Sequence, residues 1–347
     1  MPIRSKSAIA LAAITLLLCA CSSVAEGGDR DATETVLRLG YFPNVTHAAA
    51  IVGIEEGILA DALGESVELQ AQAFNAGPDV IEAIFNGALD ASFIGPNPAI
   101  NGFTRSNGEA IRIVSGATSG GASLVVDDDI TSARDLVGTT LATPQLGNTQ
   151  DVALRAWLAD QGFETDLEGG GDVSVVPQSN GDALAAFVAG EIDGAWVPEP
   201  WATRMVEEGG GQVLVNESDL WPNGQFVTTH LIVATEFLEA HPDTVRDLVA
   251  GHLDATDSVN DDPAAAQRVV SAAIAELTDT VLPEGTLAAA WENLEFTVDP
   301  IAASLAESAR NAVALGLLDN GDIDGIYDLT LLNEVLGGLG RDEIPQP

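Results

Sequence analysis

The chain has 347 residues, of which 53 are acidic and 13 are basic, and its formal net charge at pH 7 is −40. A negative charge of this size favours solubility and argues against nucleic acids and anionic membrane surfaces as partners, because both would repel the chain. The only lysine is Lys6. Acidic residues in place of lysine are typical of a halophilic protein, since concentrated salt shortens the range of the repulsion.

Residues 1–20 have the pattern of an export signal. Two basic residues precede an uncharged apolar run that is too short to span a bilayer. The sequence Leu-Cys-Ala-Cys that follows resembles a bacterial lipoprotein processing box, so we expect Cys21 to become a lipidated first residue and residues 21–35 to be a flexible tether. An ordinary signal peptide cut further along, or an uncleaved anchor, is the alternative. Cys19 would leave with the signal, so no disulfide framework is available.

An internal repeat with a spacing of 103 residues follows. The segment Phe42 to Pro98 aligns with Gln145 to Pro200, and each copy shows a polar corner, a helix pattern and a strand that ends at a Pro-x-Pro sequence. The offset is 103 up to the strand, and the register of the Pro-x-Pro sequences is slipped by one residue. Strands that alternate with amphipathic helices predict a mostly parallel sheet covered on both faces. Two copies therefore predict two similar α/β lobes. Chance similarity between two βαβ units is the competing interpretation, and the unbroken offset argues against it.

The rest of the chain predicts a split arrangement of these lobes. Beyond residue 235 the pattern is helical, with prolines placed to begin helices, and a helical tail without strands must pack on an existing lobe. We expect lobe 1 to comprise residues 36–118 and 228–347, and lobe 2 to comprise residues 119–227. The connections near 116–121 and 225–230 are the expected hinge crossovers, because glycine and short strands absorb backbone rotation.

The ligand site is expected where the strands end. Open α/β sheets bind ligands beyond the carboxyl ends of their strands, where helix N-termini present free N–H groups. Facing N-termini would supply neutral donors for a small anion. For any single corner residue, N-capping of its own helix is the competing interpretation. The corner residues are Asn44, Thr46 and His47 in the first copy and Gln145, Asn148, Thr149 and Gln150 in the second.

Four segments resemble the aliphatic sulfonate, taurine and nitrate group of ABC-transporter substrate-binding proteins. They are residues 40–47, 93–100, 144–151 and 196–201. The resemblance implies an α/β, two-lobed periplasmic-binding-protein-like type II fold with hinge crossovers and a helical C-terminal extension. It implies a protein that is not an enzyme, needs no cofactor or metal, and captures a small sulfonate-type anion. The protein would be exported as a monomer, lipid-anchored at the outer face of the cell membrane or in the periplasm, and would deliver the ligand to an ABC permease driven by a cytoplasmic ATPase.

Carried onto this sequence, the resemblance adds further cleft residues. Glu199 would either meet a cationic part of the ligand, such as the ammonium of taurine, or cap the helix that follows it. Aromatic side chains at strand ends would cover an alkyl chain or belong to the core. Arginine is scarce in the repeat region, so head-group recognition would depend mainly on neutral donors. The added residues are Phe42, Asn75, Gly77, Gly95, Asn97, Glu199, Trp201 and Thr228.

The identity of the ligand stays open in the sequence. Nitrate, bicarbonate and a thiamine-precursor pyrimidine are alternatives to alkyl sulfonates and taurine, and a tethered ligand sensor is an alternative to a transport subunit. Enzyme signatures are absent, since the sequence has no Gly-x-Ser-x-Gly elbow, no Walker loop and no His-Glu-x-x-His motif. An enzyme on the same fold, such as a thiamine-precursor synthase, is disfavoured because the chain has an export signal and its expected mature part has neither a cysteine nucleophile nor a lysine.

Overall fold

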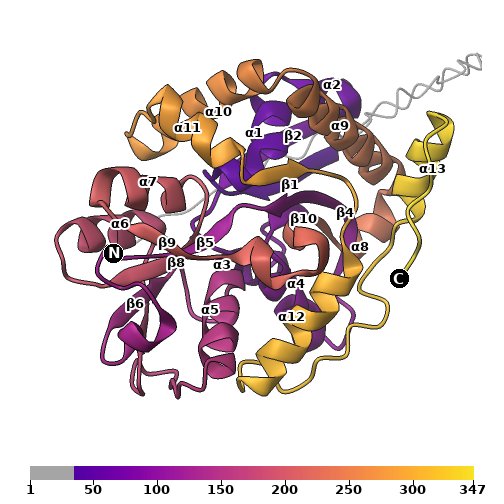
Figure 1. Cartoon of the computed structure of the whole chain (residues 1–347). Helices are drawn as coiled ribbons and strands as arrows, with labels where there is room; N and C mark the ends of the chain where they lie inside the picture. Colours follow the sequence, from indigo (N-terminus) through magenta and orange to yellow (C-terminus); the bar gives the residue numbers. More distant parts are fainter. Residues whose placement is uncertain (1–34) are drawn as a thin grey trace, which may run out of the picture. The chain divides into compact units, whose positions relative to one another are not determined.

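The structure is a computed structural model that describes residues 35–347. The predicted export signal, the lipidated Cys21 and nearly all of the tether lie outside the described residues. Helices surround two separate β-sheets (Figure 1). Over residues 35–347, no helix combines the length and the apolar character that a membrane span requires.

Sheet A is the larger of the two sheets. Its strands are β1 (Thr35–Tyr41), β2 (Val67–Ala73), β3 (Ala91–Ile94), β4 (Ile111–Gly120), β10 (Val227–Ala234) and β11 (Leu294–Phe296). They lie in the order β11-β4-β10-β3-β1-β2. The strands β1, β2 and β3 are parallel to one another, whereas β10 runs antiparallel to both β3 and β4. Sheet A therefore contains two strands from the second half of the chain, since β10 is inserted between β3 and β4 and β11 lies at the edge beside β4.

Sheet B repeats this arrangement. Its strands are β5 (Ala122–Val126), β6 (Thr140–Thr143), β7 (Ser174–Pro177), β8 (Gly194–Pro198) and β9 (Gln212–Asn216). The order β7-β6-β8-β5-β9 corresponds to the order β2-β1-β3-β10-β4 of sheet A, and in both sheets the fourth strand is antiparallel to its neighbours. The two repeat copies thus build the same strand arrangement, as the internal repeat predicts.

Seven helices and several 3-10 turns connect the strands of the repeat region. They are η1 (Val45–His47), α1 (Ala48–Glu55), α2 (Ile58–Leu63), α3 (Gly77–Phe85), α4 (Pro96–Arg105), η2 (Ala133–Leu136), α5 (Thr149–Asp160), α6 (Asn180–Val188), α7 (Trp201–Gly209), η3 (Glu217–Leu220) and η4 (Pro222–Gly224). Helices α3 and α6 begin and end at positions exactly one repeat length apart. The repeat therefore extends to helix boundaries.

The C-terminal part of the chain is mostly helical, but it is not without strands as expected, because it contributes the short strand β11 to the edge of sheet A. Its helices are α8 (Thr235–Ala240), α9 (Pro242–Asp261), α10 (Pro263–Thr278), α11 (Glu284–Trp291), α12 (Ala302–Ala314) and α13 (Thr330–Gly338). Two of them begin at a proline, as expected. Leu253 of α9 and Leu305 of α12 belong to one buried core with Leu39 of β1. The helical tail is thus packed on the elements of sheet A (Figure 1), and α11 and α12 also contact α7 and α5, respectively.

Two adjacent crossovers connect the sheets. Gly120 and Gly121 join β4 to β5 with φ values of 80° and 73°, and Gly120 N donates to Phe226 O at 3.3 Å, just before β10. A Cβ on Gly120 would lie 2.5 Å from Asn293 O, which requires glycine there. The division of the chain into two closing lobes, with the bounds given above, remains our proposal.

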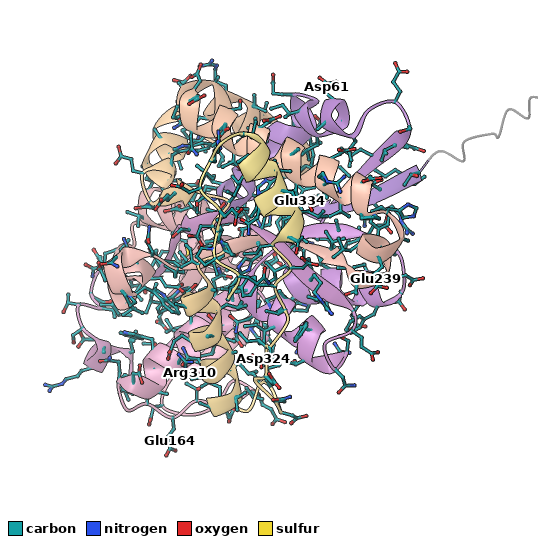
Figure 2. The ribbon with its side chains drawn as sticks, turned by 90° about the vertical axis from the view of Figure 1, so that its right-hand side faces the viewer. Asp61, Glu164, Glu239, Arg310, Asp324 and Glu334 are labelled. Atoms are coloured by element: carbon teal, nitrogen blue, oxygen red, sulfur yellow. The ribbon has the colours of Figure 1, made fainter. Side chains whose placement is uncertain are left out.

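Acidic side chains are distributed over the surface. Asp61 of α2, Glu164 after α5 and Glu239 of α8 are exposed and lie in different regions of the view in Figure 2. The negative charge is therefore not confined to one patch. An approaching anion is repelled by the summed field of the whole molecule and not by a single surface.

Candidate functional site

A cavity of about 30 Å³, which we call the polar chamber, lies between the two sheets. Most of its walls come from the carboxyl ends of the parallel strands β1, β2, β3, β6, β7 and β8 and the segments that follow them, and Thr228 of β10 completes the lining. This is the position at which open α/β sheets bind ligands. The residues that line it are Phe42, Asn44, Thr46, His47, Asn75, Ala76, Gly77, Gly95, Pro98, Pro144, Asn148, Thr149, Gln150, Asn180, Pro198 and Thr228.

Helix N-termini converge on the polar chamber from both sides. Gly77 and Asn180 are the first residues of α3 and α6, Gly95 precedes α4, and Thr149 begins α5. Helices α3 and α4 begin without a side-chain cap, whereas Asn148 caps α5 by accepting from Asp151 N at 2.9 Å. Free N–H groups and the positive ends of the helix dipoles therefore face a common space, which suits a compact anion.

The first corner holds its polar groups in fixed positions. Asn44 does not cap the turn that follows it; its Oδ1 accepts from Trp201 Nε1 at 2.9 Å. His47 Nδ1 accepts from Phe42 N at 3.4 Å, and burial lowers the pKa of His47 to about 3. The imidazole is therefore neutral near pH 7, and with Nδ1 accepting, its proton is on Nε2, where it can be donated.

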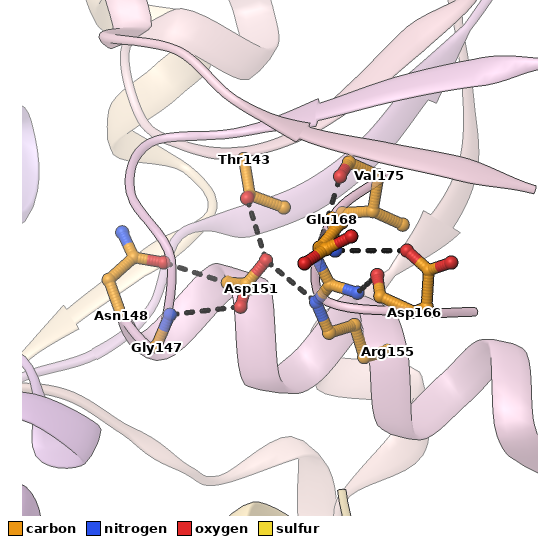
Figure 3. Close-up of polar contacts among 8 residues, drawn as sticks. All are labelled: Thr143, Gly147, Asn148, Asp151, Arg155, Asp166, Glu168 and Val175. Carbon is orange, nitrogen blue, oxygen red and sulfur yellow. Dashed lines mark hydrogen bonds and ion pairs between the residues drawn. The ribbon is translucent and has the colours of Figure 1, made fainter. Parts of the chain in front are cut away.

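The second corner is braced by a buried ion pair (Figure 3). Asp151 accepts from Gly147 N and Thr143 Oγ1, both at 2.9 Å, and pairs with Arg155 Nε at 3.0 Å. The Arg155 guanidinium also donates to the carbonyl of Asp166 at 2.7 Å. Arg155 therefore positions the loop at the start of α5 and does not clamp the ligand. Sequence reasoning missed this role, although the two residues lie four apart on a predicted helix.

Most of the predicted site residues line the polar chamber, and four do not. Asn97 Nδ2 donates to Ser308 O at 3.3 Å, so its side chain is directed toward α12. Gln145 is half-buried outside the lining, and its Oε1 is buried without a hydrogen-bond partner. Trp201 lies outside the lining, and its Nε1 donates to Asn44 Oδ1. The lining residues among those predicted are Phe42, Asn44, Thr46, His47, Asn75, Gly77, Gly95, Asn148, Thr149, Gln150 and Thr228.

Glu199 is the fourth predicted residue outside the polar chamber. Its carboxylate accepts from Thr203 N and Oγ1, both at 3.1 Å, in the first turn of α7. Asn293 Nδ2 also donates to this carboxylate, at 2.8 Å. Burial raises the pKa of Glu199, and these donors work against that rise. These contacts agree with the helix-capping interpretation of Glu199. They do not point to a contact between Glu199 and the ammonium of a ligand.

The structure adds five residues to those that sequence reasoning selected, and they are Ala76, Pro98, Pro144, Asn180 and Pro198. Asn180 lies one repeat length after Gly77, and Pro198 lies one repeat length after Gly95. Both glycines were selected, so applying the 103-residue offset to them would have found Asn180 and Pro198, two of the five missed residues.

The polar chamber contains neither an acidic nor a fully basic side chain among the described residues that line it. The same part of the chain, residues 35–347, shows no cluster of three or more His, Cys, Asp or Glu side chains able to hold a metal ion. The available groups are amides, hydroxyls, backbone N–H groups and one neutral imidazole. Such a set can bind a small oxyanion without a counter-charge.

Comparisons with known proteins give the relatives of this chain. The taurine-binding periplasmic protein of Escherichia coli (strain K12) is 25% identical over 182 residues, which are 52% of this chain and 54% of that protein. The alkanesulfonate-binding protein of Xanthomonas axonopodis pv. citri, solved with bound MOPS, has a TM-score of 0.70 at 20% identity and covers 85% of this chain and 98% of its own. The periplasmic nitrate-binding protein of Synechocystis PCC 6803 has a TM-score of 0.72 at 15% identity, with coverages of 88% and 89%.

These similarities confirm the expected fold, that of periplasmic binding proteins. The three proteins are named as binding proteins, in agreement with the expectation that this chain is not an enzyme. The sequence model of the NMT1-like family matches residues 30–275, well over half of the sequence, and the chain therefore belongs to the NMT1-like family.

Proposed function

We propose that the chain is the extracytoplasmic solute-binding subunit of an ABC importer and that it captures a small sulfonate in the polar chamber. The observation that carries this proposal is the convergence of four helix N-termini on a cavity lined by neutral donors. A sulfonate presents three oxygens to such donors and keeps its charge at every physiological pH. The names of the taurine-binding and alkanesulfonate-binding relatives support this ligand class.

A bare trigonal oxyanion such as nitrate is the second candidate. The volume of the polar chamber, about 30 Å³, favours it, because a space of this size holds only about two water molecules. The similarity to a nitrate-binding protein points in the same direction. Bicarbonate belongs to the same chemical class, whereas a pyrimidine ring requires a wider opening of the cavity.

Calorimetric titration distinguishes these ligands. The purified chain is titrated at high salt with ethanesulfonate, taurine, nitrate and bicarbonate. Tighter binding of a sulfonate than of nitrate supports the proposal, and the reverse order would replace it with the second candidate. If the folded chain binds none of the four anions, the polar chamber is not an oxyanion site.

A matched pair of variants tests whether the polar chamber is the site. Thr149→Val removes one hydroxyl donor and keeps the shape of the side chain. Because a hydrogen bond to a charged group contributes about 1.5–3 kcal/mol, we expect sulfonate affinity to fall roughly 10- to 100-fold. Thr330→Val changes an exposed threonine of α13 and should leave affinity unchanged. Equal affinities in both variants would remove the start of α5 from the site.

We further propose that Cys21 carries a lipid anchor at the outer face of the membrane and that the partner is an ABC permease with a cytoplasmic ATPase. Metabolic labelling with a fatty acid should be lost in Cys21→Ser, and labelling that persists would contradict the anchor. Permease and ATPase genes beside this gene support delivery, whereas a receptor gene in their place would support a tethered sensor.

A further inference from the structure

The polar groups of the first corner are oriented by partners that can only donate hydrogen bonds. Trp201 Nε1 lies 2.9 Å from Asn44 Oδ1, and both side chains are buried. An indole N–H cannot accept, so Asn44 must turn its carbonyl oxygen to Trp201 and keep its NH2 group for another partner. His47 is held in the same way, because the N–H of Phe42 occupies its Nδ1 and leaves the imidazole proton on Nε2.

The indole of Trp201 reaches Asn44 from the other sheet. Trp201 begins α7, which follows β8 of sheet B, whereas Asn44 follows β1 of sheet A. A backbone hydrogen bond of 3.1 Å from Val45 N to Glu199 O holds the two loops together, and the Arg204 guanidinium covers the indole ring at 4.9 Å. The direction of the Asn44 amide is therefore fixed by a contact between the two sheets.

The second corner has the same polarity. Asn148 Oδ1 accepts from Asp151 N at 2.9 Å, and Asn148 Nδ2 donates to Gln150 Oε1 at 3.3 Å. The carbonyl oxygens of these two amides are thus engaged within the protein. Asn180 Oδ1 is fully buried, so this amide cannot accept from a ligand either. All four buried amides of the polar chamber, Asn44 included, withhold their carbonyl oxygens from it.

Few acceptors remain for a ligand. Asn75 is exposed, and no carboxylate is found among the described residues that line the polar chamber. Among the buried side chains of this lining, only the threonine hydroxyls can still accept as well as donate. An oxyanion without a proton needs donors alone, and the polar chamber supplies them. An oxyanion that carries a proton brings an O–H group, which would face N–H groups.

We propose that the polar chamber selects oxyanions by their protonation: it binds those without a proton, such as sulfonates and nitrate, and rejects those that carry one, such as bicarbonate and phosphonate monoanions. Trp201 is the positioning residue for this selection, because its N–H directs the Asn44 amide. The inference rests on the proposed function, because it places the head group of the ligand in the polar chamber. The conflict between two donors, which leaves a hydrogen bond unmade, is the origin of the discrimination.

Two pairs of ligands that differ by one proton test this selection in calorimetric titrations of the purified chain. At pH 6 ethanesulfonate and ethylphosphonate are both tetrahedral monoanions, and only the phosphonate keeps a proton. Nitrate and bicarbonate, titrated at pH 8 in a sealed cell, are the planar pair. In the pair that binds, we expect the ligand without a proton to bind about tenfold more tightly or better, because the other ligand loses one hydrogen bond to a charged group.

Trp201→Phe removes the indole N–H and keeps an aromatic ring. The Asn44 amide can then turn its oxygen toward the ligand, so affinity for ethanesulfonate should fall, affinity for ethylphosphonate should not, and their ratio should drop to about three or less. A merely structural defect would weaken both ligands equally and leave the ratio unchanged. Trp157→Phe, on α5 and outside the lining of the polar chamber, is the control and should keep the wild-type ratio.

Asn44→Asp is the second variant, and it decides the matter if Trp201→Phe does not fold by circular dichroism. One carboxylate oxygen can still accept from Trp201 Nε1, and the other replaces the NH2 donor with an acceptor. The added charge repels both monoanions of a pair equally, so it cancels in the ratio. The new acceptor should make ethylphosphonate the tighter ligand.

The possible results separate this inference from the proposed function. A wild-type preference smaller than about threefold, or an unchanged ratio in either folded variant, would overturn the selection by protonation while leaving the anion site in place. If nitrate binds and ethanesulfonate does not, the second candidate function replaces the first, and the planar pair decides this inference. If none of the four anions binds the folded wild-type chain, the proposed function and this inference fail together. A preference that shrinks in Trp201→Phe and reverses in Asn44→Asp supports the proposal.

Discussion

Single buried ionisable residues determine how this protein responds to pH. The carboxylate of Glu217, in the turn after β9, is buried and accepts from Trp196 Nε1 at 2.7 Å. Burial raises the pKa of Glu217 to about 7, although hydrogen bonds from Trp196 and Trp221 oppose the rise. Because this folded pKa lies above that of an unfolded glutamate, the stability linked to Glu217 is fully present below pH 4.5 and is lost as pH rises through 7.

Glu217→Gln should therefore stabilise the chain only at alkaline pH. The glutamine keeps an oxygen for Trp196 and cannot ionise, so we expect a gain of about 3 kcal/mol in the free energy of unfolding at pH 8.5 and little change at pH 5. Urea unfolding at both pH values measures the difference. Glu239→Gln, an exposed control on α8, should show no such pH dependence. A gain of equal size at both pH values would mean that ionisation of Glu217 is not the cause.

Buried histidines should limit stability on the acid side. Burial lowers the pKa of His230 and of His252 to about 4, and His252 Nε2 lies 2.8 Å from Gly116 O. Since an unfolded histidine titrates near 6.5, the stability linked to these residues is present above that pH and is lost as pH falls toward 4. His252→Gln should lose less unfolding free energy between pH 7 and pH 5 than the wild type. His241→Gln, outside the core, serves as the control, and parallel curves for both variants would contradict this.

At the scale of elements, the crossover between β4 and β5 is a point where glycine is required. Gly120 combines a φ of 80° with a carbonyl 2.5 Å from the position of an added Cβ, whereas Gly138 has a φ of 83° and open space around it. Gly138→Ala should cost about 1 kcal/mol, from backbone strain alone. Gly120→Ala should cost at least about 2 kcal/mol, because Asn293 O must also move. Equal unfolding midpoints for the two variants would show that the crossover tolerates the shift.

The elements differ in how far sequence could predict them. The repeat offset predicts two similar α/β units, because each copy is one local βαβ pattern with its own periodicity, and the observed bounds of α3 and α6 keep this offset. The polar corners follow from strand and helix order alone. Contacts between distant segments cannot be predicted in this way. The hydrogen bond between Glu199 and Asn293, which are 94 residues apart in the chain, is an example. Asn97 shows the same limit, since its partner Ser308 lies on a helix of the C-terminal tail.

A second cavity, of about 360 Å³, shows why the surroundings of the candidate site were only partly predictable. Its walls combine the start of α6, Trp201 and Arg204 of α7 and the end of α10, which no single local pattern places together. Asn180 looks like an ordinary first helix residue in the sequence. Only the structure shows that Ser179 does the capping and leaves the amide of Asn180 without a partner.

At the scale of the whole molecule, the net charge of −40 acts on both stability and ligand capture. The exposed acidic side chains repel one another, and this repulsion is largely screened in concentrated salt, where the Debye length falls from about 10 Å at 0.1 M to about 3 Å at 1 M. We expect the melting temperature to rise over this range of NaCl. Sucrose stabilises proteins by exclusion from their surface and does not screen charge, so it serves as the comparison. A rise in melting temperature that is caused by screening should level off above about 1 M NaCl, whereas a rise caused by exclusion should not.

The same field predicts an unusual sign for the salt dependence of binding. A site that relies on arginine loses affinity and association rate as salt rises, because screening weakens its attraction for the anion. Here the polar chamber offers neutral donors inside a strongly negative molecule, so an approaching sulfonate is repelled at long range. The association rate constant, followed by stopped-flow fluorescence of the tryptophans, should therefore rise severalfold between 0.1 and 1 M NaCl, while the dissociation rate constant changes little. A falling association rate would mean that a cationic group controls entry, and Arg204, which lines the second cavity, would be the residue to replace.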